Sequence, residues 1–61
     1  KFIRGRLYTR KGPGTGYPVV SYLKQGDIVD VYEEKFGWFR INQDPIEQEW
    51  CSGHDYYWER L

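Results

Sequence analysis

Apolar and polar residues alternate over short stretches of this chain, and no long window repeats with the 3.6-residue period of a helix. Val, Ile, Tyr, Phe and Trp are frequent whereas Ala and Met are absent, which favours strands over helices. Glycines recur between the alternating stretches, where they supply turns. The pattern therefore predicts several short strands joined by tight turns.

The alternation also sorts side chains between two faces of the predicted sheet. Val29 and Val31 are expected to face one way, while the polar Asp30 marks the opposite face as the wetter one. In the following strand Phe39 is expected to face inward and Trp38 outward. Several short strands without a helix predict an all-β fold, a small barrel of five to six short antiparallel strands. The strands are expected at about 2–9, 19–23, 28–34, 38–42, 50–51 and 56–61.

A glycine-rich loop, residues 10–18, is expected between the first two strands. Gly12, Gly14 and Gly16 are expected to adopt backbone angles that other residues avoid, and Pro13 restricts the loop further. Tight turns are expected near 24–26, 35–37 and 52–53, and a longer polar loop near 43–49. The first loop is therefore predicted to be stiff, although stiffness alone does not identify a ligand.

Length and composition set further bounds. The 61 residues are enough for a single domain, residues 1–61, and the lone Cys51 excludes an internal disulfide. Because 20% of the residues are aromatic, one small core cannot enclose every ring, so the surplus rings are expected at the surface. The chain begins at Lys1 rather than at a methionine, and we expect it to be a fragment or a mature piece of a longer protein.

Charge and hydropathy argue against two classes of partner. Nine Lys and Arg balance nine Asp and Glu, so the chain lacks the overall basic charge that is typical of a nucleic-acid binder. No apolar run approaches the roughly 20 residues that span a bilayer. We therefore expect no nucleic-acid partner and no membrane partner.

Cys51 is predicted to be neither a metal ligand nor a catalytic nucleophile. The spacing Cys51-x-x-His54 suggests a metal site, but a structural zinc ion needs about four ligands and only Asp55 lies nearby. A nucleophilic cysteine would also need a base and an orienting group in a water-excluding cleft. Cys51 is instead interpreted as a small buried hydrophobe and His54 as a turn residue. The sequence thus predicts no catalytic residue, no metal and no cofactor.

The stretch LYTRKGPGTGYPVVSYLKQGDIVDVY resembles the bacterial SH3 domain, often written SH3b. Gly37 and Trp38 match its Gly-Trp pair, and Trp50 matches a later tryptophan. Four residues depart from the family pattern, namely Thr9, Gly14, Glu49 and Cys51. The residues at matching spacing in the quoted stretch are Leu7, Arg10, Gly12, Pro13, Tyr17, Val19, Leu23, Gly26, Val29 and Val31.

This resemblance implies a function. SH3b domains accompany bacterial and phage cell-wall hydrolases, so a non-catalytic module that binds peptidoglycan and targets a catalytic domain of the same parent chain is expected. The implied partner is the stem peptide or cross-bridge of peptidoglycan, and the implied location is extracellular or associated with the cell wall. One alternative is a protein-interaction SH3 module that recognises an extended or proline-rich peptide. Another is a structural spacer or lid in a larger enzyme.

Four aromatic residues are predicted to bind the ligand: Tyr8, Trp38, Tyr17 and Tyr56. Tyr8 and Trp38 match residues that face the groove of SH3 domains. Tyr17 ends the stiff loop, and folding that loop onto the barrel is the alternative role. Tyr56 would join a stacking surface with Tyr8 and Trp38, or else cap the barrel. Rigid exposed aromatics are typical of recognition sites.

Overall fold

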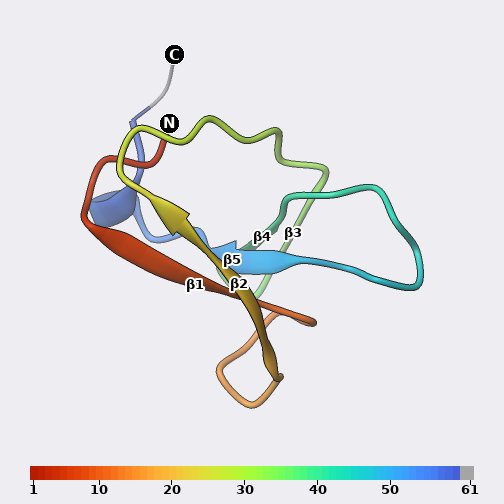
Figure 1. Ribbon diagram of the computed structural model, residues 1–61. Helices are drawn as coiled ribbons and strands as arrows, with labels where there is room; N and C mark the ends of the chain where they lie inside the picture. Colours follow the sequence, from red (N-terminus) through yellow and green to blue (C-terminus); the bar gives the residue numbers. More distant parts are fainter. Residues whose placement is uncertain (60–61) are drawn as a thin grey trace.

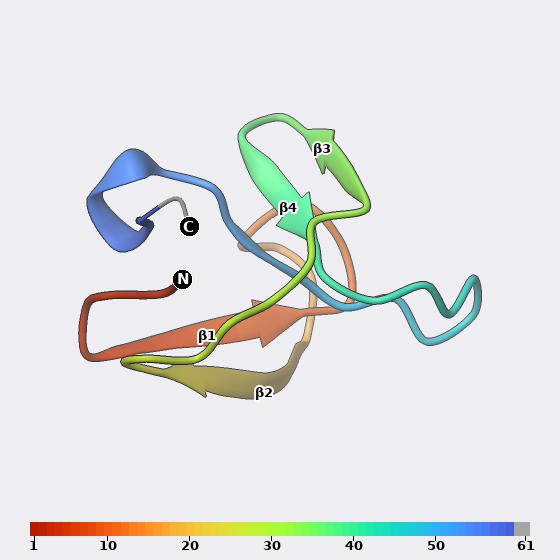
Figure 2. The ribbon, with the colours of Figure 1, turned by 90° about the horizontal axis from the view of Figure 1, so that it is seen from above.

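The computed structural model describes residues 1–59 and confirms an all-β fold (Figure 1). Five antiparallel strands form one sheet, in the spatial order β2-β1-β5-β4-β3. Figure 2, seen from above, shows β1 and β2 on the far side of the molecule from β3 and β4. The elements are β1 (Arg6–Arg10), β2 (Val19–Lys24), β3 (Glu33–Lys35), β4 (Trp38–Arg40), β5 (Trp50–Ser52) and the 3-10 helix η1 (Asp55–Tyr57).

Two hairpins follow the turn signals of the sequence. β1 and β2 pair from Arg6↔Lys24 to Arg10↔Val19, with a bulge near the end of the ladder. β3 and β4 are joined by Phe36 and Gly37, which both have positive φ, of 53° and 78°. Two positive φ angles match the right-handed twist of the flanking strands, because this is the backbone of a type I′ turn. Gly26, in the turn expected near 24–26, has φ 98°.

Three expected strands differ from the alternation; the one expected at 38–42 ends at Arg40. The first begins at Arg6 rather than near Phe2, because Gly5 has φ 51° and breaks the extended backbone. The third covers only Glu33–Lys35, whereas residues 28–32 belong to no strand. Its partner β4 ends at Arg40, after which the chain leaves for the 43–49 loop, so no backbone remains opposite residues 28–31 to continue the ladder.

The expected closing strand at 56–61 is wrong for the residues described. Asp55–Tyr57 form η1 instead, and Leu61 lies outside the described residues. His54 caps η1, since its Nδ1 accepts the N–H of Tyr56 at 3.1 Å. One bridge, Phe2↔Trp58, joins the two ends of the described chain. The C-terminal segment therefore closes the fold through a helical turn and a single bridge.

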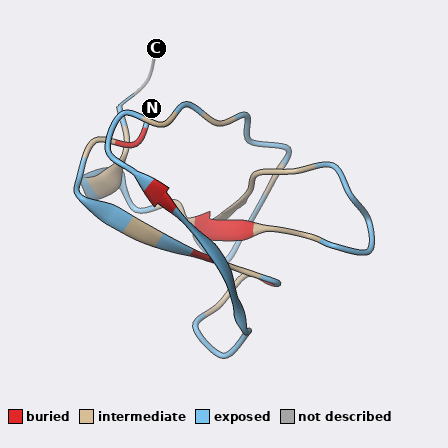
Figure 3. Ribbon diagram, viewed as in Figure 1, coloured by how far each residue is buried: buried red, intermediate tan, exposed pale blue. Residues whose placement is uncertain are grey.

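The hydrophobic core is small, and Figure 3 shows buried residues in β5, in β2 and close to the N-terminus. Phe2, Leu23 and Cys51 are buried in it. Trp50, next to Cys51, is also buried, and strand alternation places it on the opposite face of β5. The central strand β5 is therefore covered on both faces. Partly buried side chains that pack against the core are Leu7, Val29, Phe39, Ile41, Tyr57 and Trp58.

Candidate functional site

Tyr8 lies in the middle of β1 and is 62% exposed. Its neighbour Thr9 is fully buried, so the two side chains take opposite faces of the strand, as the alternation predicted. Tyr8 pairs across the hairpin with Tyr22, which is also exposed. The structure thus places Tyr8 at the surface, where it is available for contact.

The loop between β1 and β2 is ordered by its own contacts. The Lys11 N–H donates to the Pro18 carbonyl at 3.0 Å, and the Arg10 guanidinium donates to the Tyr17 carbonyl at 3.0 Å. The Tyr17 ring packs on Gly12 so closely that a Cβ there would overlap it. None of the three loop glycines has positive φ, so the expectation of unusual backbone angles at these positions is wrong. Gly12 is required by the Tyr17 ring instead.

Trp38 begins β4 and is half-buried, opposite Lys35 in β3 and Ser52 in β5. Its neighbour Phe39 packs against the core, which confirms the predicted inward direction of Phe39. Trp38 is therefore on the other face of the sheet, neither sealed in the core nor fully exposed.

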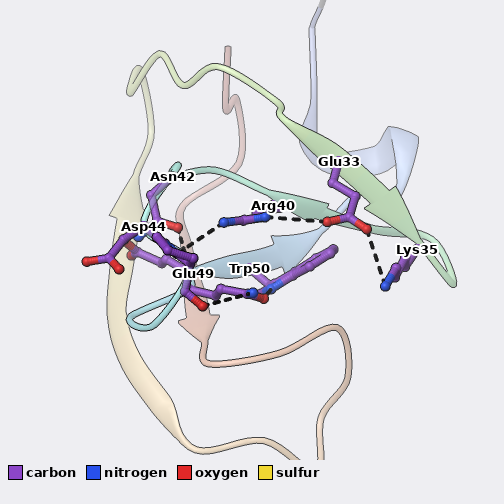
Figure 4. Close-up of polar contacts among 9 residues, drawn as sticks. Glu33, Lys35, Arg40, Asn42, Asp44, Glu49 and Trp50 are labelled. Carbon is purple, nitrogen blue, oxygen red and sulfur yellow. Dashed lines mark hydrogen bonds and ion pairs between the residues drawn. The ribbon is translucent and has the colours of Figure 1, made fainter.

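A row of polar contacts runs along this same face of the sheet (Figure 4). Arg40 lies 3.6 Å from the carboxylate of Glu33 and donates to the Asp44 carbonyl at 3.1 Å. The indole N–H of Trp50 donates to the Gln48 side chain at 2.9 Å. The backbone N–H groups of Glu47 and Ile46 bind the Asp44 carboxylate and hold its pKa below the ordinary value. These contacts fix the 43–49 loop against the sheet.

Tyr56 lies in η1 and is 57% exposed. The Arg4 guanidinium lies 4.7 Å from the centre of its ring, and the Arg4 Nε donates to the Tyr56 carbonyl at 3.1 Å. Tyr56 lines a small hollow together with Ser52, His54 and Tyr57. Ser52 is also the cross-strand neighbour of Trp38, so this residue connects two of the predicted binding residues.

A larger hollow, of about 580 Å³, lies between residues 28–31 and the C-terminal segment. Ile28 and Val31 contribute apolar side chains that are 66% and 49% exposed, and Phe39 and Trp58 complete the apolar wall. We name it the acidic hollow, because three acidic residues line it: Asp30 from one segment, and Asp55 and Glu59 from the other. Its remaining lining residues are Lys1, Val29 and Gly53.

None of the four predicted binding residues lines the acidic hollow. Their roles in binding remain predictions, and the structure does not gather all four in either hollow. Val29 and Val31, which were expected to face the same way, both line this hollow; Val29 packs against the core whereas Val31 is 49% exposed, because residues 28–32 are not in a strand. Sequence analysis missed the acidic hollow for the same reason, although Asp30 between two valines was a visible signal.

Cys51 and His54 do not form a reactive pair. Cys51 is fully buried, and burial raises the pKa of its thiol to about 12, with a smaller contribution from Glu49. His54 is exposed and engaged as the cap of η1. Within residues 1–59, no three His, Cys, Asp or Glu side chains are grouped so that they could hold a metal ion. The part of the chain that the structure describes also contains no helix of the length and apolarity needed to cross a membrane.

Comparisons with known proteins give one finding. A family model described as the bacterial SH3 domain matches residues 5–56. No curated protein and no solved structure matches this chain. The matched range includes all five strands and η1 up to Tyr56. The family is one of binding domains, generally non-catalytic, and the five-stranded sheet described above carries exposed aromatic and apolar side chains suited to such a role. The chain therefore belongs to the bacterial SH3 domain family.

Proposed function

We propose that this domain binds the peptide part of peptidoglycan and so targets a cell-wall hydrolase to its substrate. Membership of a family of binding domains supports this proposal. The observation that carries it is the acidic hollow, in which exposed aliphatic side chains lie beside three carboxylates. A ligand with small apolar side chains and an ammonium group suits such a surface. Stem peptides and cross-bridges of peptidoglycan have this chemistry.

The contacts expected in the hollow are of two kinds. Ile28 and Val31 offer apolar surface that water now covers, and its burial favours binding. Asp30 and Asp55, from opposite walls, offer acceptors for an ammonium group. Because the hollow is open and small, affinity from one domain is expected to be weak, roughly micromolar or poorer. Attachment to a catalytic domain would raise the effective concentration of the ligand.

The predicted aromatic residues extend this proposal. Tyr56 lines the second hollow, and Trp38 is the cross-strand neighbour of Ser52 in its lining, so a longer peptide would extend over this part of the surface. Under this proposal the domain acts outside the cell or in the cell wall, beside a catalytic domain of its parent chain.

The test is sedimentation of the purified chain with bacterial sacculi that have been stripped of anionic polymers by acid extraction. Ile28→Ser is expected to lower the bound fraction several-fold, because it removes apolar surface from the acidic hollow. Ile46→Ser is the matched control, since Ile46 is 86% exposed on the 43–49 loop, away from that hollow. Thermal unfolding of both variants checks that each remains folded.

The result decides among the functions. Equal sedimentation of the two variants would place the binding surface elsewhere. A failure of the wild-type chain to sediment, together with retention on a proline-rich peptide column, would favour a protein-interaction module. No binding in either experiment would favour a spacer.

A further inference from the structure

The zero net charge of this chain conceals a separation of charge along the sequence. Residues 1–26 contain six of the nine Lys and Arg and no Asp or Glu. Residues 27–61 contain all nine Asp and Glu and only three Lys and Arg. The first 26 residues include β1, β2 and the loop between them, so most of the positive charge lies on one hairpin and the segment before it.

Part of this charge lies on one face of the β1–β2 hairpin. Arg6, Tyr8 and Arg10 alternate along β1 with Leu7, which packs against the core, and with Thr9, which is buried. Across the ladder, Lys24 pairs with Arg6 and Tyr22 pairs with Tyr8, so they share that face. We name it the basic face; it comprises Arg6, Tyr8, Arg10, Tyr22 and Lys24.

The cations of the basic face are not neutralised by ion pairs. The ion pairs within residues 1–59 join Glu33 to Lys35 and to Arg40, on β3 and β4. Asp27, the acid nearest to Lys24 in sequence, accepts the Lys24 backbone N–H at 2.8 Å. Glu49 accepts from the hydroxyl of Thr9, whose side chain is on the opposite side of β1. The basic face therefore presents positive charge to solvent.

The geometry suits an extended anionic chain. Arg6 and Arg10 are four residues apart on one strand, a separation of about 13 Å, and Lys24 lies beside Arg6. The Arg10 Nη1 donates to the Tyr17 carbonyl, which holds the guanidinium in place, and its other N–H groups can bind a phosphate. Cations spaced along one direction match a polymer with regularly spaced phosphates.

Two rings lie on this face, and one of them is already engaged. The Arg6 guanidinium lies 5.0 Å from the centre of the Tyr22 ring and occupies one face of it, so Tyr8, at 62% exposure, is the more open ring. Proteins that bind single-stranded nucleic acid stack successive bases on several aromatic side chains. The basic face offers charges without such a series. We propose that it binds a linear phosphodiester polymer without bases, of the polyol-phosphate type.

The test uses the full 61-residue chain and poly(glycerol phosphate), with binding followed by isothermal titration calorimetry. We expect binding that weakens roughly 10- to 20-fold between 50 and 200 mM salt, as for release of counterions at about three contacts. Arg6→Gln combined with Lys24→Gln should weaken binding at least tenfold. Lys35→Gln, which removes the same kind of charge from β3, should not. If the double variant does not fold, Lys24→Gln alone should give a smaller loss.

The inference is overturned if poly(glycerol phosphate) does not bind. It is also overturned if poly-glutamate or an oligothymidylate of the same charge binds as tightly as poly(glycerol phosphate) or more tightly. A third contrary outcome is a loss of affinity in Lys35→Gln that equals the loss in the double variant. Poly-glutamate would indicate an acidic protein partner, and the oligothymidylate a nucleic acid. The sacculi used for the proposed function lack anionic polymers, so the acidic hollow and the basic face succeed or fail independently.

Discussion

The hydroxyl of Thr9 donates a hydrogen bond of 2.6 Å to the carboxylate of Glu49. Thr9 is fully buried in β1, and Glu49 immediately precedes β5. Both residues depart from the pattern of the bacterial SH3 family, which usually has valine at the first position and glycine at the second. The structure shows that these two departures are partners, since a buried hydroxyl needs an acceptor and Glu49 supplies one.

The first prediction concerns this pair. Thr9→Val removes the donor and leaves the partly buried Glu49 carboxylate without it, which we expect to cost about 1–3 kcal/mol of unfolding free energy. Thr9→Val combined with Glu49→Gly should cost less than the sum of the two single changes, because neither partner is then left unsatisfied. Urea unfolding of the wild-type chain, the two single variants and the double variant at pH 7 measures this coupling. Strictly additive losses would show that the hydrogen bond contributes nothing.

The second prediction concerns the contact between Gly12 and Tyr17. Gly12→Ala would place a methyl group inside the Tyr17 ring, so the loop must shift, at a cost of about 1–3 kcal/mol. Gly16→Ala is the matched control, because a Cβ at Gly16 meets nothing within 4 Å and its φ is not positive. It should be neutral or slightly stabilising. Thermal unfolding separates the two, and equal melting temperatures would contradict the contact.

The third prediction concerns Phe36, a large side chain in an unfavourable backbone conformation. Its φ is 53° and its side chain is 88% exposed, so the left-handed conformation is not compensated by burial. Phe36→Asn should raise the unfolding free energy by about 0.5–1 kcal/mol, because Asn-Gly is a favoured type I′ pair. Ile46→Asn removes a similarly exposed apolar side chain where φ is not positive. An equal change in both variants would show that the gain does not come from the turn.

The hairpins could be predicted from the sequence because their causes are local. Gly26 and Gly37 mark turns that need positive φ, and both have it. The strands at 19–24 and 50–52 were predicted to within one residue, since alternation and neighbouring turn residues define them.

The segments that were predicted incorrectly depend on distant partners. Residues 28–32 alternate like a strand, but the backbone opposite them leaves for the 43–49 loop, which is itself held by Arg40 and Asp44. Phe2 and Trp58 pair across almost the whole chain, and no local pattern encodes that bridge. The exposure of Tyr8 and Tyr56 could be anticipated, whereas the acidic hollow could not, because two remote segments form it. The separation of charge, by contrast, was visible in the sequence.

The last prediction concerns the thiol of Cys51. Since burial raises its pKa to about 12 from an ordinary value of 9.0, the folded chain should react with a disulfide reagent at pH 8 only as fast as it unfolds. A group whose pKa is raised by folding keeps the native state protonated while the unfolded state loses its proton. Its stabilising contribution is therefore complete below about pH 9 and is lost as the pH rises toward 12.

The unfolding free energy should accordingly fall over this range by up to about 1.4 kcal/mol per pH unit more in the wild-type chain than in Cys51→Val. Urea unfolding at several pH values measures the difference, and the Val variant corrects for the tyrosines and lysines that titrate in the same range. Rapid modification of the native thiol at pH 8, or parallel pH profiles for the two chains, would contradict the buried, protonated state of Cys51.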